Sequence, residues 1–360
     1  MIVKLGSLIS EYSVRNKADE DIPVYSVTNE QGFCTGYFSK EVASQDRTTY
    51  KIVPRGCFAY NPSRINVGSV DVQECEDRVI VSPLYVVFSV DEKLNRRYLL
   101  HYLKSDITLT YIKAYASGSV RDNLKFSILK DFPINLPSAE EQEQIVATLD
   151  GIEHLIALRK EEIASLDKLV KSRFIELFGD PKSNPKGYTK KQLGETCKVI
   201  TGNTPSRAVA EYYGDHIEWI KTDNIVSGLL NPTTATECLS EKGMTVSRTV
   251  ESGAILMACI AGSVSSIGRV CVTNRKVAFN QQINAIVPYD YNILFLYAML
   301  QISKEYLVDG INMALKGILS KSKLEEKTFF VPPIELQEQF AAFVEQTDKS
   351  KLCGEMEVAA

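Results

Sequence analysis

The sequence predicts an α+β protein that consists of two similar units, each a mixed α/β domain followed by a long helix. Three observations support this. A segment occurs twice, a long proline-free stretch has heptad spacing, and the remaining chain alternates short β-rich runs with turn-forming residues. The segment LPSAEEQEQIVA at 136–147 recurs as VPPIELQEQFAA at 331–342, a shift of 195 positions. A period of that length is too long for a solenoid and has the size of a domain plus a helix.

The repeat extends to both ends of the unit, while the interiors have diverged. KLGSL at 4–8 opens the first unit, and QLGET at 192–196 opens the second. One scaffold that carries two different binding specificities would give this pattern, and drift after a duplication would give it as well. Further matches are Leu124 and Leu129 with Leu319 and Leu324 and, with a small insertion, Gly56 and Gly68 with Gly253 and Gly268.

The expected elements follow the chain in the same order in both units. Each unit starts with β-rich runs separated by turns, continues with a helical stretch and ends in a helical arm. The expected parts are a first domain at 1–135, a helical arm at 136–185, a second domain at 186–330 and a second arm at 331–360. The runs are YKIVPRGCFAY (50–60), VIVSPLYVVFSV (79–90), GAILMACIAG (253–262) and GRVCVTN (268–274), with helices near 95–115 and 291–308.

The first arm is predicted to be a single long helix from Glu140 to about Phe178. Ser138 and Glu141 form a capping-box pattern at its start, and the sequence Gly-Asp-Pro at 179–181 ends it. Thirty-nine residues at about 1.5 Å each give a rod of roughly 58 Å, too long for the core of one small domain. Its apolar residues follow coiled-coil spacing and form a seam that needs a partner helix: Ile145, Leu149, Ile152, Ile156, Ile163, Leu166, Val170 and Leu177.

The second arm begins in the same way and is expected to stop early. The heptad spacing is lost after Lys349, and Gly354 follows. We therefore expect a helix about one third as long as the first, with a disordered tail or a truncated arm after it. The seam residues Ile163, Leu166 and Val170, with Leu177, would then stay exposed or be covered by another subunit.

Composition indicates a globular protein without a membrane span or a structural metal. Hydrophobic residues make up 44% and charged residues 24% of the chain. No apolar run has the length of a membrane span, and the N-terminus does not resemble a secretory signal, so we expect a cytoplasmic protein. Eight cysteines without a CxxC pair, and three histidines, make a zinc site improbable.

The negative charge is concentrated in the two helical arms. The net charge is −4 in 136–185 and −4 in 331–360, whereas it is +1 in 1–135 and +3 in 186–330. Neutral to mildly basic domains allow nucleic-acid binding through local patches, while acidic arms would be repelled by phosphate and attracted to a basic protein surface. We expect the arms to bind protein through Leu149 and Ile156 in the seam, flanked by Glu143, Glu153 and Glu161.

Polar segments of both domains offer candidate contacts to DNA. Arginine can pair with guanine and asparagine or glutamine with adenine. The alternative is that buried amides satisfy loop backbone, and Trp219 is expected in the core rather than as a base-stacking platform. The candidates are Thr204, Ser206 and Arg207 in the loop TGNTPSR (201–207), Asn280 and Gln282 in VAFNQQINAIVP (277–288), and Asn61 and Arg64 in the first domain.

The order of these motifs resembles the specificity subunit of type I restriction–modification systems. The resemblance rests on TGNTPSR, YYGDHIEWIKTDNI (212–225), AFNQQINAIVP and both helix starts, and more loosely on NPSRINVG (61–68) and VIVSPLYVVF (79–88). It implies that each domain is a target recognition domain for one half of a bipartite double-stranded DNA sequence. The helices would form an antiparallel coiled coil that binds modification subunits, which methylate adenine with S-adenosylmethionine, and a restriction subunit would join them.

No catalytic centre is expected in this chain, and no cofactor. Tyr60-Asn-Pro-Ser63 lacks the second proline and the aromatic residue of an adenine methyltransferase, and no GxxxxGK[ST] loop is present. The three histidines have no nucleophile nearby in sequence, and His154 is expected to be exposed on the helix. The alternative functions are a coiled-coil scaffold, or a truncated recognition subunit that does not bind DNA productively.

Overall fold

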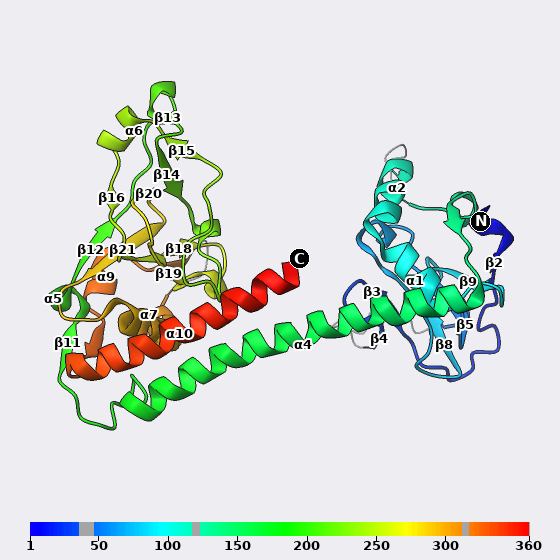
Figure 1. Ribbon diagram of the computed structural model, residues 1–360, viewed down its shortest axis with the longest axis horizontal. Helices are drawn as coiled ribbons and strands as arrows, with labels where there is room; N and C mark the ends of the chain where they lie inside the picture. The colour runs from blue at the N-terminus through cyan, green and yellow to red at the C-terminus, as the bar shows by residue number, and fades with distance from the viewer. Residues whose placement is uncertain (36–46, 117–122, 312–316, 360) are drawn as a thin grey trace. The chain divides into compact units, whose positions relative to one another are not determined.

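A computed structural model shows two compact units, Met1–Leu155 and Ile156–Ala360, and confirms the α+β class with a long helix (Figure 1). The structure describes residues 1–35, 47–116, 123–311 and 317–359. Helix α4 (Ala139–Phe178) belongs to the first unit up to Leu155 and to the second unit from Ile156. Among the described residues, no helix is both long enough and apolar enough to cross a membrane.

The first unit is built on an antiparallel four-stranded sheet with the order β2-β9-β6-β7. Short strand pairs β1-β10, β3-β4 and β5-β8 surround it, and the core packs the sheet against helix α1. The strands are β1 (Ile2–Lys4), β2 (Ile9–Glu11), β3 (Ser26–Thr28), β4 (Gly32–Cys34), β5 (Lys51–Pro54), β6 (Phe58–Tyr60), β7 (Val70–Val72), β8 (Arg78–Val81), β9 (Val86–Val90) and β10 (Pro133–Asn135); the helices before α4 are α1 (Arg96–Lys104), α2 (Asp106–Ala116) and α3 (Phe126–Leu129).

The second unit contains the equivalent four-stranded sheet, in the order β12-β21-β17-β19, and a further sheet, β13-β15-β14-β20-β16. Its strands are β11 (Lys190–Gln192), β12 (Cys197–Thr201), β13 (Tyr213–Gly214), β14 (Ile217–Ile220), β15 (Cys238–Leu239), β16 (Thr249–Val250), β17 (Ile255–Ala258), β18 (Ile260–Ala261), β19 (Val270–Val272), β20 (Val277–Phe279), β21 (Ile283–Pro288), β22 (Gly317–Ile318) and β23 (Thr328–Phe330); its helices are α5 (Leu193–Thr196), α6 (Glu241–Thr245), α7 (Ile293–Ile302), α8 (Lys304–Val308), α9 (Lys321–Glu325) and α10 (Ile334–Ala359).

A repeated glutamine explains why the helix starts have kept their sequence. Gln142 is 1% exposed, and its Oε1 accepts the backbone N–H of Asn95, the N-cap of α1, at 2.7 Å. Gln337 is fully buried and accepts the N–H of Asn292, the N-cap of α7, at 2.9 Å. Each glutamine also donates to the carbonyl of the proline five residues before it. The repeated residue therefore joins the arm to the domain in both units, because it satisfies partly or fully buried backbone groups of both.

The repeated glycines occupy equivalent tight positions. A Cβ on Gly6 would lie 2.8 Å from Lys130 Cβ, and one on Gly194 would lie 3.0 Å from Glu325 Cβ. Lys130 and Glu325 are themselves 195 residues apart. The interior pairs also agree, because Gly56 and Gly253 have φ of 81° and 89°, and Gly68 and Gly268 have 88° and 75°. A positive φ favours glycine, which explains why these four glycines match between segments that have otherwise diverged.

The second arm is longer than the sequence suggested. Helix α10 has 26 residues against 40 in α4, about two thirds rather than one third, and it continues through Gly354 to Ala359. A glycine inside a helix costs only about 1 kcal/mol relative to alanine, which packing can offset. Here the Cβ position of Gly354 lies 3.4 Å from Ile163 on α4. The expectation that the helix stops where the heptad spacing is lost, after Lys349, is therefore wrong.

Within the second unit, α10 packs along the last part of α4 and corrects the expectation of an uncovered seam (Figure 1). Phe174 and Phe178 of α4 are fully buried and contact Phe340 of α10, with ring centroids 5.4 and 5.7 Å apart. The seam residues Ile163, Leu166, Val170 and Leu177 are half-buried rather than exposed. The exposed apolar residues of α4 are instead Ile145, Leu149, Ile152, Leu155, Leu158 and Leu169.

Candidate nucleic-acid interface

The polar loop after β12 is held by aromatic side chains. Pro205 is buried, and its carbonyl accepts the Tyr213 hydroxyl at 2.8 Å. The indole N–H of Trp219 donates to the carbonyl of Asn203 at 3.3 Å. Trp219 is 3% exposed, so its expected place in the core is confirmed. Tyr213 of β13 and Trp219 of β14 therefore fix the path of the loop.

Arg207 extends from this loop into a small cluster of charges. Its guanidinium donates twice to Glu237, and its Cζ lies 4.4 Å from the ring centroid of Tyr213 and 5.3 Å from that of Trp219. Lys221 Nζ donates to the same carboxylate at 2.5 Å and lies 5.1 Å from the Trp219 ring. The hydrogen bond from Arg207 is the largest cause that lowers the pKa of Glu237 to about 2. Two cations share one carboxylate, and the cluster keeps an excess positive charge at an exposed edge.

Neighbouring side chains extend the polar edge and tie it to the adjacent turns. Thr204 donates its hydroxyl to the Gln281 side chain, and Ser206 is exposed. Arg248 Nη1 donates to the carbonyl of Thr201 at 2.7 Å, while its backbone N–H donates to Asn203 Oδ1 at 2.8 Å. Lys221, Glu237 and Arg248 could not be identified from the sequence, because only the sheet brings them beside the loop.

Asn280 and Gln282 satisfy each other in the turn between β20 and β21. Asn280 is 6% exposed, its Oδ1 accepts the backbone N–H of Gln282 at 3.0 Å, and its Nδ2 donates to Gln282 Oε1 at 3.2 Å. This is the structural alternative considered for these amides. A base contact by Asn280 would require the turn to open, so the geometry favours Arg207 and Thr204 over it.

In the first unit, Asn61 and Arg64 lie at a cavity of about 280 Å³. Asn61 Oδ1 accepts the backbone N–H of Ser63 at 3.0 Å and fixes the turn. Arg64 is exposed, and within the described residues its guanidinium has no hydrogen-bond or ion-pair partner. Arg64 is thus available to an external anion, whereas Asn61 holds the turn that presents it. The polar residues around them are Ser26, Thr28, Asn29, Glu30, Gln31 and Ser69.

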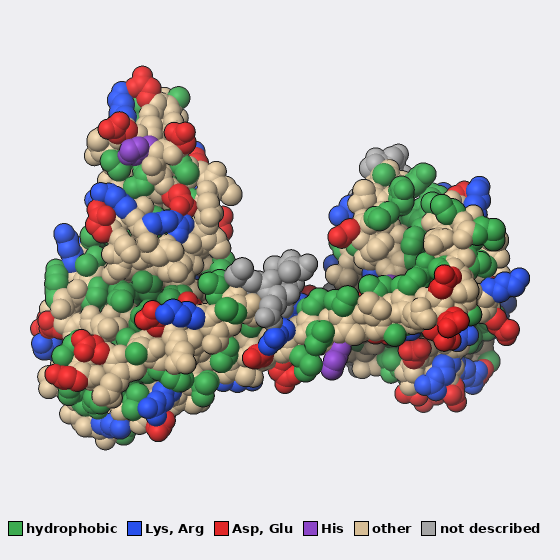
Figure 2. All heavy atoms as spheres, in the orientation of Figure 1, with side chains coloured by type: hydrophobic (Ala, Val, Ile, Leu, Met, Phe, Trp, Pro, Cys, Tyr) green, Lys and Arg blue, Asp and Glu red, His purple; other side chains and the backbone are tan. Residues whose placement is uncertain are grey.

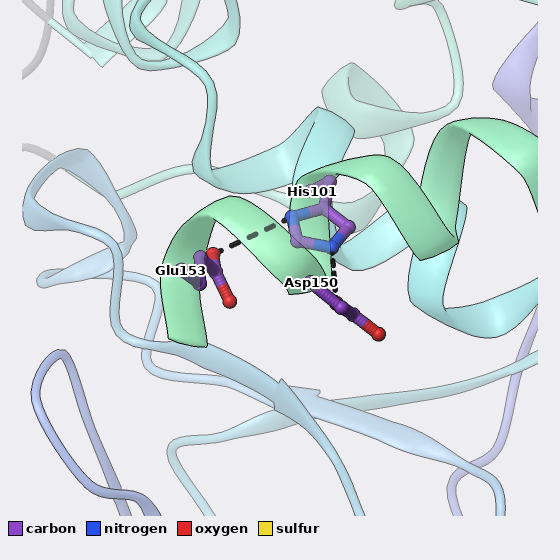
Figure 3. Close-up of side chains that lie close together, drawn as sticks. All are labelled: His101, Asp150 and Glu153. Carbon is purple, nitrogen blue, oxygen red and sulfur yellow. Dashed lines mark hydrogen bonds and ion pairs between the residues drawn. The ribbon is translucent and has the colours of Figure 1, made fainter. Parts of the chain in front are cut away.

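A second charged cluster, His101 with Asp150 and Glu153, joins α1 to α4 (Figure 3). His101 Nε2 lies 2.7 Å from Asp150 Oδ1, and Nδ1 lies 3.5 Å from Glu153 Oε1. Arg97 also donates to Asp150 at 2.7 Å, and this bond is the main cause that lowers the pKa of Asp150. The two carboxylates lie beside different ring nitrogens (Figure 3), and one ligand atom from each of the three residues lies within 4.8 Å of the others. Together with Arg97, His101 ties α1 to α4 within the first unit.

The five residues expected to bind a partner lie mostly at the surface of α4. Glu143, Glu161 and Leu149 are exposed, Ile156 is half-buried, and Glu153 already faces His101. Figure 2 shows acidic side chains and apolar patches together on this helix. His154 is exposed, as expected.

The comparisons with known proteins agree with this arrangement. The family model described as "Type I restriction modification DNA specificity domain" matches residues 6–168 and again residues 185–353. The chain belongs to this family. Each match includes an α/β domain and most of its helical arm, so the specificity domain comprises both parts. The repeat found in the sequence is therefore a pair of specificity domains.

Individual relatives of this specificity-domain chain are distant. It is 25% identical over 270 residues to the type I restriction enzyme MjaIX specificity subunit of Methanocaldococcus jannaschii, covering 69% of this chain and 61% of that protein. It is 31% identical over 149 residues to the HindI specificity subunit of Haemophilus influenzae, covering 40% of this chain and 31% of that protein. The chain thus spans less than two thirds of the length of either curated relative.

Solved structures share the fold along the whole chain. One, from a study of complex assembly and conformational transition of the type I R-M system, has a TM-score of 0.60 at 18% identity. The S subunit from M. genitalium has a TM-score of 0.52 at 15% identity. Both comparisons cover 100% of this chain and 92% of the other.

Proposed function

We propose that the chain is a non-catalytic recognition subunit that binds a bipartite sequence in double-stranded DNA. The observation that carries this proposal is the double match of the specificity domain, on two units with the same scaffold and unlike interiors. In this function the scaffold residues, such as Gln142 and Gln337, hold each domain on its arm. The diverged loops read one half of the target each.

In the second domain, Arg207 would contact DNA from a preorganised position. Stacking on Tyr213 and the two bonds to Glu237 restrict the side chain, which reduces the entropy lost on binding. Arg207 and Lys221 together outweigh the single charge of Glu237, so the edge attracts phosphate. In the first domain Arg64 is the equivalent candidate, with Asn61 as its support.

The arms would bind protein rather than DNA. Their net charge of −4 each repels phosphate, while the exposed apolar and acidic residues of α4 suit a partly basic protein surface. We propose that modification subunits dock there through Glu143, Leu149, Glu153, Ile156 and Glu161, and that a restriction subunit joins the complex. The chain itself would then need no cofactor and would act in the cytoplasm.

Binding of the purified chain to a randomised duplex pool tests the proposal. We expect enrichment of a sequence with two separated half-sites, and an affinity that falls steeply with salt. A coiled-coil scaffold, or an inactive truncated subunit, would show neither. If the chain binds no duplex even at 50 mM salt, where phosphate contacts are strongest, the proposal is contradicted.

A further inference from the structure

The second unit contains a cavity of about 620 Å³ between the end of α4, the helix α10 and the pair α7–α8. This volume lies in the range of ligand-binding pockets and is large enough for a long side chain of a partner protein. Its lining is mixed, with more polar and charged side chains than aliphatic ones. The aliphatic side chains include Val170 and Ile175 of α4, Val344 of α10, and Ala298, Ile302 and Val308 of α7–α8.

The polar end of the cavity has more carboxylates than cations to pair with them. Lys351 is 9% exposed, and its ammonium donates to Asp167 across the two helices. Asp348 lies one turn before Lys351 on α10 and is half-buried. Among the described residues its carboxylate has no hydrogen-bond or ion-pair partner. Burial is the largest cause of the raised pKa of Asp348; the nearby charge of Lys351 lowers it in part, and Asp167 raises it.

The remaining charges at the cavity do not compensate Asp348. Lys304 donates to the carbonyl of Ser265 at 2.5 Å, and the backbone N–H groups of residues 182 and 183 donate to Asp180. Lys171 and Glu305 are exposed at the rim. An ionised carboxylate that is partly removed from water without a partner is unfavourable. A cation supplied from outside would therefore bind here with an electrostatic gain.

We propose that this cavity receives an arginine side chain of the modification subunit, with Asp348 as its carboxylate. The inference rests on the proposed function, which supplies the partner. The arginine methylenes would lie along Val170 and Val344, and the guanidinium would pair with Asp348 beside the Lys351–Asp167 pair. Arginine is favoured at interface hot spots because its planar group pairs with carboxylates in two-bond geometry while its stem packs on apolar walls.

The test compares three full-chain variants in binding to the co-purified modification subunit and, separately, to target DNA. Asp348→Asn removes the carboxylate at constant size, Asp348→Glu keeps the charge, and Glu338→Gln removes an exposed charge from the same helix. We expect Asp348→Asn to weaken subunit binding at least tenfold, Asp348→Glu to retain most of it, and Glu338→Gln to change it less than twofold. The melting temperature of Asp348→Asn alone should not fall, because an unpaired charge has been removed.

Three outcomes would overturn the inference, and they can be told apart. If the wild type binds the subunit and Asp348→Asn binds it equally well, the cavity has no such role while the proposed function stands. If the wild type binds neither the subunit nor DNA, the proposed function fails and the inference fails with it. A drop in the melting temperature of Asp348→Asn that matches its loss of binding would show a structural role instead.

Discussion

Replacing Glu237 with Gln removes the carboxylate that offsets one of the two positive charges in the candidate DNA-binding cluster. Glu237 accepts two hydrogen bonds from Arg207 and one from Lys221. In Glu237→Gln, both cations keep their aromatic neighbours and lose their counter-charge. The local charge of the three residues rises from +1 to +2. The variant should therefore bind phosphate more strongly and bind DNA with lower sequence specificity.

The size of the effect follows from counterion release. Each additional neutralised phosphate steepens the slope of log K against log salt by about 0.9. If the variant makes one more phosphate contact, its loss of affinity between 50 and 200 mM salt should be about threefold to fourfold larger than the loss in the wild type. The cost to stability is modest, about 0.5–2 kcal/mol, because the pairs are partly exposed.

Fluorescence anisotropy with a non-target duplex at four salt concentrations measures this slope. We expect Glu237→Gln to bind more tightly than the wild type at 50 mM salt and to lose affinity more steeply. Glu211→Gln is the matched control, because Glu211 pairs with Lys242 outside this loop. An unchanged slope, with weaker binding at every salt concentration, would refute the role assigned to the cluster and leave Glu237 a purely structural residue.

Four further results are expected. Arg207→Ala should weaken binding to the specific target by about 1–3 kcal/mol if the guanidinium reaches a base edge, whereas a lower melting temperature with unaltered binding would make the side chain structural. The ionised carboxylate of Glu237 stabilises the wild type relative to Glu237→Gln. This free-energy difference should reach its full value above pH 4.5 and disappear as the pH falls toward about 2, because the pKa of Glu237 is depressed in the folded state. Urea unfolding at several pH values measures it. Gln142→Ala should cost about 1–3 kcal/mol in urea unfolding, because it leaves buried backbone groups unsatisfied, whereas exposed Gln144→Ala should cost under 0.5 kcal/mol. Gly354→Ala should raise the melting temperature, since a Cβ there meets only ordinary contacts and alanine favours the helix by about 1 kcal/mol.

The sequence allowed the architecture to be predicted because the residues that join arm and domain are repeated. Gln142 and Gln337 hold equivalent N-caps, and the paired glycines have equivalent backbone angles, so selection on the scaffold left a visible pattern. The length of α10 could not be obtained in the same way. Gly354 was expected to mark the helix end, and only the folded structure shows that α10 continues to Ala359.

The candidate site was predicted only in part, because its decisive contacts are long-range. Arg207 was identified from its polar loop, but its partner Glu237 lies 30 residues away and comes beside it through the β14-β15 pairing. Asn280 looked like a base-reading residue, and its burial against Gln282 became visible only in the folded turn. The tie between His101 and Asp150 spans 49 residues and left no local signal.

Exchange of one domain tests the two-half-site account most directly. Residues 186–330 would be replaced by the corresponding part of another specificity subunit, and both proteins would be used to select duplexes from a randomised pool. The account predicts that one half of the selected sequence changes, while the other half stays the same. A change in both halves, or in neither, would contradict it.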